Sequence, residues 1–164
     1  MITMRNLLKP LLFILSLIIT LSCNYADPNS DLREVQNIQV IELYVKELWN
    51  MRNLSLLDSI IGEDFVDPAS TSGKKGPEDL REVISGYLSV YPDLTIKLED
   101  LVADHHKVAW KYSATGTNKN TGEKVTFSGI IIDDIEQGKI VNRVGVWMRS
   151  ISDLTSSSPH SVSR

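Results

Sequence analysis

Two aspartates have positions in this sequence that fit acid–base chemistry. Asp67 closes the segment Asp64–Asp67, and Asp100 falls in an alternating run where an apolar residue is due. A carboxylate in apolar surroundings can remove or supply a proton. Each also has a structural interpretation, because Asp67 can cap a turn before Pro68 and Asp100 can belong to a β-bulge at Glu99 and Asp100. Asp67 and Asp100 are the candidate catalytic residues, and both alternatives stay open.

Adjacent histidines follow the first predicted strand, at His105 and His106. Two neighbours on an extended chain point to opposite sides, and no third ligand is evident in the sequence. The sequence therefore predicts no metal site, and it predicts no cofactor.

A group of aromatic and polar side chains could line a small-molecule pocket. The candidate ligand-binding residues are Tyr87, Trp110, Tyr112, Phe127, Asn142 and Met148. Aromatic side chains are more often core than ligand contacts, so a packed core is the alternative. Tyr87 stands apart because a buried phenol requires a hydrogen-bond partner. Asn142 would be the polar group that orients the ligand.

The elements that must position these residues begin with three predicted helices. Apolar residues at spacings of three and four mark the stretches Leu32–Trp49, Leu56–Ile61 and Leu80–Leu88. Gly62 is a typical helix stop, and Pro77 is a favoured first helical residue.

Alternating apolar and polar residues then predict an antiparallel sheet from Leu94 to Met148, with turns at Asp104–His106, Thr115–Gly122 and Glu136–Gly138. The residues expected to face the helices are Val108, Trp110, Tyr112, Ala114, Val125, Phe127, Ile131, Ile140, Asn142, Val144, Val146 and Met148. That set holds no Asp, Glu or His on the last three strands. The other face is apolar as well, at Ile130 and Ile132 among others, which suggests a homodimer through the outer face of the sheet.

The N-terminus resembles an export signal. Arg5 and Lys9 precede an apolar run, Leu11–Leu21, that is short for a membrane span. The single cysteine, Cys23, follows directly, as at the lipidation site of bacterial lipoproteins; an ordinary signal peptide or an uncleaved anchor is the alternative. We expect a signal peptide at 1–22, a tether at 23–31, a domain at 32–149 and a disordered tail at 150–164. The protein would be exported and anchored to the bacterial cell envelope, with Cys23 as the lipidated residue.

Composition limits the function further. The chain has 164 residues, 42% of them hydrophobic and 23% charged, which fits one globular domain. Its net charge of -4 and the lack of a basic stripe argue against a nucleic-acid partner.

Helices followed by a curved antiparallel sheet resemble the nuclear transport factor 2-like fold, an α+β cone. More specifically, residues 40–148 resemble the SnoaL-like polyketide cyclase (ester cyclase) family. The resemblance is carried by Tyr44–Asn50, Asp64–Asp67, Gly76–Arg81, Tyr91–Leu94, Lys107–Ala109, Thr115–Thr117, Thr121–Val125 and Gly138–Val141.

The resemblance implies a pocket for an oily, multi-carbonyl molecule and a ring closure that needs a base and donors for an enolate. The positions that match the family's acid and histidine are Met148 and Asn118 here. Three hypotheses follow. The domain binds an apolar small molecule, or it is a cyclase or isomerase in which Asp67 or Asp100 replaces the acid, or it is a dimeric assembly module.

Overall fold

The protein was analysed as a computed structural model that describes residues 30–151, with side chains from 31 to 148. The predicted signal peptide, Cys23 and most of the tether and tail lie outside the described residues. The described residues after Ser30 belong to one compact unit. Within the described part, no helix is long and apolar enough to cross a membrane.

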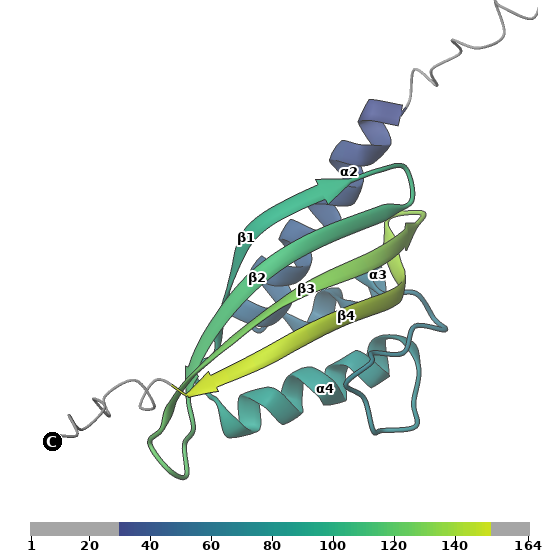
Figure 1. Cartoon of the computed structure of the whole chain (residues 1–164). Coiled ribbons are helices and arrows are strands. Elements are labelled where there is room, and N and C mark those ends of the chain that lie inside the picture. The colour runs from purple at the N-terminus through teal and green to yellow at the C-terminus, as the bar shows by residue number, and fades with distance from the viewer. Residues whose placement is uncertain (1–29, 152–164) are drawn as a thin grey trace, which may run out of the picture. The chain divides into compact units, whose positions relative to one another are not determined.

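Helices precede a four-stranded sheet, as predicted. The elements are α2 (Ser30–Leu43), the π-helix η2 (Tyr44–Asn50), the 3-10 helix η3 (Leu54–Leu56), α3 (Leu57–Ile60), α4 (Gly76–Val90), β1 (Thr95–Ala103), β2 (Lys107–Thr117), β3 (Lys124–Glu136) and β4 (Lys139–Ile151). The strands are all antiparallel and lie in the order β1-β2-β3-β4. The helices cover one face of this curved sheet (Figure 1). This confirms the predicted α+β architecture.

A β-bulge interrupts β1 where the sequence predicted one. The β1–β2 register shifts between Leu98 and Asp100, so that Glu99 is the extra residue. Asp100 is exposed and belongs to this irregularity. The structural interpretation of Asp100 is therefore confirmed.

A second bulge, in β4, was not predicted. Asp134 pairs with Asn142 and Ile135 with Ile140, which leaves Val141 as the extra residue. Because one inserted residue exchanges the two faces of a strand, every side chain after it points opposite to the expected side.

The predicted inner face of β4 is wrong from Asn142 onward for that reason. Asn142 and Met148 point away from the helices, and Met148 is 74% exposed. Arg143, Gly145 and Trp147 face the helices instead.

The π-helix places two aromatic side chains on the same side of the chain. Its backbone bonds span five residues, so Tyr44 and Trp49 lie one turn apart, and both are buried. The Asn50 side chain bonds both the N–H and the C=O of Ile96, each at 2.8 Å. Arg52, with φ of 60°, donates to backbone oxygens of Trp49 and Leu94 among others. These bonds fix the end of η2 against the start of β1.

Candidate functional site

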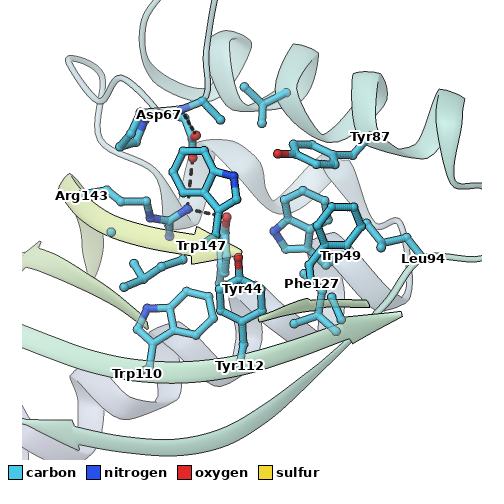
Figure 2. Close-up of a pocket in the computed structure, with 17 residues that line it drawn as sticks. Tyr44, Trp49, Asp67, Tyr87, Leu94, Trp110, Tyr112, Phe127, Arg143 and Trp147 are labelled. Atoms are coloured by element: carbon cyan, nitrogen blue, oxygen red, sulfur yellow. Dashed lines mark hydrogen bonds and ion pairs between the residues drawn. The ribbon is translucent and has the colours of Figure 1, made fainter. Parts of the chain in front are cut away.

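A pocket of about 90 Å³ lies between the helices and the concave face of the sheet (Figure 2). Its lining is mostly aromatic and aliphatic, and all three tryptophans of the chain take part: Trp49, Trp110 and Trp147. The other lining residues are Tyr44, Asp67, Pro68, Ala69, Val83, Tyr87, Leu94, Ile96, Tyr112, Ala114, Phe127, Ile131, Arg143 and Gly145. An apolar wall with few polar groups is the usual composition of a small-molecule site.

Two glycines in the sheet allow side chains of the pocket wall to lie close to the backbone. A Cβ atom at Gly129 would lie 2.8 Å from Cε1 of Tyr112, so the phenol ring lies directly across the neighbouring strand. A Cβ at Gly145 would approach Cγ1 of Ile131 at 3.0 Å. The missing side chains at these two positions let the Tyr112 ring and the Ile131 side chain pack close to the backbone of the neighbouring strand.

Edge-to-face contacts fix the aromatic wall. The ring of Tyr87 is T-shaped to Trp49 at 5.9 Å and to Phe127 at 6.3 Å, measured between ring centroids. Tyr44 and Trp110 form a similar pair at 6.1 Å. Such geometries are the preferred ones for aromatic rings, and they hold side chains from η2, α4 and the sheet in register.

One end of the pocket carries a buried charged cluster centred on Arg143. Its Nε and Nη2 donate to the two carboxylate oxygens of Asp133, at 2.7 and 2.9 Å. Its Nη1 donates to Tyr44 Oη at 2.6 Å and to Asp67 Oδ2 at 3.2 Å. Trp110 Nε1 donates to Asp133 at 2.8 Å. We call Arg143, Asp133, Asp67, Tyr44 and Trp110 the Arg143 cluster.

Burial and pairing act in opposite directions on the arginine. Burial alone would lower the pKa of the Arg143 guanidinium, but the charges of Asp133 and Asp67 hold that pKa well above its usual value. Burial also raises the pKa of Tyr44, against the opposing effect of Arg143. Arg143 therefore stays a cation and Tyr44 a neutral phenol over the physiological range.

The two carboxylates of the cluster are not equivalent. Asp133 accepts three side-chain hydrogen bonds and is fully buried. Asp67 accepts one bond from the Ala69 N–H, at 2.8 Å, and the longer one from Arg143. Two carboxylates face one guanidinium, so with both ionised the cluster carries one surplus negative charge. Asp67 is the more weakly bonded carboxylate, and it lines the pocket.

A third buried carboxylate, Asp79, holds the loop that carries Asp67. Asp79, in the first turn of α4, accepts bonds from the Asp67 N–H at 2.9 Å and from the hydroxyls of Ser70 and Ser72. Burial opposes the charge of Asp79, but these three donors outweigh it and lower the pKa of that carboxyl. The loop is thereby attached to α4 with Asp67 turned toward the pocket.

The candidate residues from the sequence divide into two groups. The structure places Asp67, Tyr87, Trp110, Tyr112 and Phe127 around one pocket. It places Asp100, Asn142 and Met148 outside that pocket, because of the two bulges. The roles of the five pocket residues stay predictions.

Sequence reasoning did not select four residues that line the pocket or belong to the Arg143 cluster: Tyr44, Asp133, Arg143 and Trp147. The expectation that no acid on the last three strands faces inward is wrong, because Asp133 does. A signal was present for Asp133, which continues the alternation of Phe127 and Ile131 on β3. Among the described residues no group of three or more potential metal ligands is found.

The chain matches known proteins in fold and in family. It is similar to a solved structure from Acidithiobacillus ferrooxidans with a TM-score of 0.61 and 18% identity, covering 68% of this chain and 87% of that one. TsrD from Streptomyces laurentii matches with a TM-score of 0.61 and 21% identity, covering 69% and 88%. A SnoaL-like polyketide cyclase from Agrobacterium tumefaciens matches with a TM-score of 0.59 and 22% identity, covering 68% and 91%.

At these identities the solved structures establish the fold. No curated protein matches the chain in sequence. The family model for SnoaL-like polyketide cyclases matches residues 39–149, more than half of the chain, and this stretch contains the π-helix, the Asp67 loop, β1 to β3 and most of β4. The chain therefore belongs to the SnoaL-like polyketide cyclase family.

Proposed function

We propose that this domain binds an apolar small molecule in the pocket between its helices and its sheet. The observation that carries the proposal is the convergence of three tryptophans on one cavity whose single charged end is the Arg143 cluster. Aromatic walls remove apolar surface of a ligand from water, and a few fixed polar groups set its orientation.

The size of the pocket limits how much of the ligand it encloses. Drug-sized sites are about 300–1,000 Å³, whereas this pocket has about 90 Å³. A group of about one ring fits inside. The remainder of a larger ligand would extend past Trp147, whose side chain is 47% exposed at the pocket.

The tryptophans provide the test. Toluene is titrated into isotope-labelled protein, and the indole N–H resonances of Trp49, Trp110 and Trp147 are followed. We expect saturable shifts of these resonances, and their loss in Val83→Phe, which fills the pocket from α4. Ser85→Phe adds the same ring at an exposed position of α4 and serves as the control. Toluene shifts that are absent in the wild type, or unchanged in Val83→Phe, would contradict the proposal.

A second candidate function is proton transfer at carbon next to a carbonyl, as in a cyclase or isomerase. The observation that favours it is the Asp67 carboxylate, which opens on the pocket and has fewer hydrogen bonds than Asp133. Asp67 would take a proton from the ligand carbon and return it after the double bond has moved. Donors in the pocket would hold the enolate oxygen in the meantime.

Hydrogen–deuterium exchange tests this candidate with a simple ketone. In D₂O the methyl protons of acetophenone should exchange faster with the protein than with buffer alone. Asp67→Asn should lower the catalysed rate by about 10²–10⁴-fold. Asp64→Asn, in the same segment but largely exposed, is the control. An equal rate for wild type and Asp67→Asn would exclude Asp67 as the base.

Export, lipid anchoring and pairing of two copies complete the proposed function. The supporting features are the apolar run and Cys23 in the sequence and the exposed apolar side chains on the outer face of the sheet. Anchoring is tested with Cys23→Ala, which should lose acyl mass and leave the detergent phase. Acyl mass retained by that variant would contradict lipidation at Cys23.

A further inference from the structure

Two tyrosines, Tyr87 and Tyr112, line the pocket but do not belong to the Arg143 cluster. Tyr87 on α4 and Tyr112 on β2 point their hydroxyls into the pocket from opposite walls (Figure 2). No side-chain hydrogen bond joins either hydroxyl to another residue between 31 and 148, while Tyr44 beside them is bonded to Arg143. Every fully enclosed polar side-chain atom in this range has a hydrogen-bond partner. Because the two hydroxyls have none, they are not fully enclosed and can be reached from the pocket that they line.

The surroundings hold both groups in place without using their oxygens. The ring of Tyr112 lies against Gly129 and beside Trp110, at 5.5 Å between ring centroids. Tyr87 is fixed by its T-shaped contacts with Trp49 and Phe127. Burial, followed by the proximity of Tyr87 and Tyr44, raises the pKa of Tyr112 to about 12. Burial raises the pKa of Tyr87 as well. Both groups are therefore neutral donors at physiological pH.

A ligand that fills the pocket excludes water from these two hydroxyls. A ligand without an oxygen at that place would leave two hydroxyls unpaired, which costs free energy, whereas a largely apolar ligand that carries an oxygen there accepts their hydrogen bonds. Sites built with buried hydrogen-bonding groups discriminate strongly against analogues that lack the matching atom.

We propose that Tyr87 and Tyr112 are the specificity-determining donors that hold a neutral carbonyl oxygen of the ligand. The proposal rests on the proposed function, because it places this oxygen in the same pocket. With both of its carboxylates ionised, the Arg143 cluster carries a surplus negative charge that disfavours a carboxylate on the ligand nearby and favours an uncharged oxygen. The charged end of the pocket and the two phenols then contact different parts of one ligand.

The test compares two molecules of the same shape. Acetophenone and α-methylstyrene differ in having an oxygen or a methylene group at one position. Their dissociation constants are measured from the tryptophan indole resonances, for the wild type, Tyr87→Phe, Tyr112→Phe and the double variant. Tyr91→Phe removes a phenol oxygen outside the pocket lining and is the matched control. Benzoate serves as the charged probe.

We expect each pocket variant to weaken acetophenone relative to α-methylstyrene by roughly 2- to 10-fold, the value of one hydrogen bond. The ratio of the α-methylstyrene to the acetophenone dissociation constant should fall most in the double variant, and it should not change in Tyr91→Phe. A ratio unchanged in both single variants and in the double variant would overturn the proposal. Benzoate that binds more tightly than acetophenone would also overturn it. If neither aromatic molecule binds the wild type, the proposed function itself fails and this inference fails with it.

Discussion

Replacement of Arg143 by methionine tests whether the pocket depends on a buried ion network. Arg143 makes four side-chain hydrogen bonds, and it is 8% exposed. Methionine retains an unbranched apolar chain but removes the charge. Asp67 and Asp133 then lose the cation that they share, and Asp133 keeps the Trp110 indole as a donor.

The expected loss is large on the scale of one domain. Removal of one partner of a buried ion pair costs about 3–5 kcal/mol, and a whole domain is stable by about 5–15 kcal/mol. For a unit of this size the loss lowers the melting temperature by roughly 10–25 °C. Adding Asp133→Leu to Arg143→Met should recover part of the stability, because an uncompensated buried charge is then removed.

The assay is urea unfolding at neutral pH, with calorimetry for the melting temperature. Arg81→Met on α4 is the control, because Arg81 is half-exposed and its contact with Glu78, at 3.4 Å, is worth about 0–1 kcal/mol. Equal unfolding midpoints for Arg143→Met and Arg81→Met would refute the energetic importance of the cluster. A double variant less stable than Arg143→Met alone would refute the explanation by unpaired charge.

Three further predictions concern the neighbouring groups. Asp79→Asn should lower the free energy of unfolding by about 1–3 kcal/mol at pH 7. Burial opposes the charge of Asp79, but its hydrogen bonds outweigh burial and lower the pKa of that carboxyl. The stabilisation is therefore present above the ordinary aspartate pKa of about 3.9 and is lost as the pH falls through the lower folded-state pKa. Urea unfolding from pH 7 to pH 2 checks it, and a difference between wild type and variant that does not shrink in acid would contradict it. Burial raises the pKa of Tyr112 to about 12, so its contribution to stability is present below about pH 10 and is lost as the pH rises toward 12. In an absorbance titration of tyrosinate, the wild type should show an ionisation step near pH 12 that Tyr112→Phe lacks. An identical titration curve for the two proteins would be evidence against this prediction. Val146 on the outer face is 72% exposed, and Val146→Lys should shift sedimentation from dimer to monomer; a wild type that already sediments as a monomer at micromolar concentration would disprove pairing through that face.

The sheet could be predicted from the sequence because its alternation is regular over most of its length. Apolar residues recur at every second position of β2, from Val108 to Ala114, and Val125, Phe127 and Ile131 keep the same spacing on β3. The register shift at Glu99 shows in the sequence as a misplaced Asp100. The register shift at Val141 leaves no comparable mark in the sequence, because apolar residues occur on both faces of β4. A strand that is apolar on both faces does not reveal its register, so β4 was assigned to the wrong side.

The site was predictable where it depends on side-chain type, and unpredictable where it depends on backbone geometry. Asp67 and the aromatic residues of β2 and β3 could be chosen from their pattern. Tyr44 and Trp49 share a side through a π-helix, which α-helical spacing does not predict. Arg143 became a pocket residue through the bulge at Val141. The periodicity of the sequence therefore could not predict the ion pair between Arg143 and Asp133.

Native mass spectrometry of the protein purified from its own host tests the binding proposal most directly. We predict a retained small molecule of low polarity on the wild type and on Ser85→Phe. The same molecule should be absent from Val83→Phe, in which the pocket is filled. A bound molecule retained equally by Val83→Phe, or no retained molecule on any of the three proteins, would contradict the account.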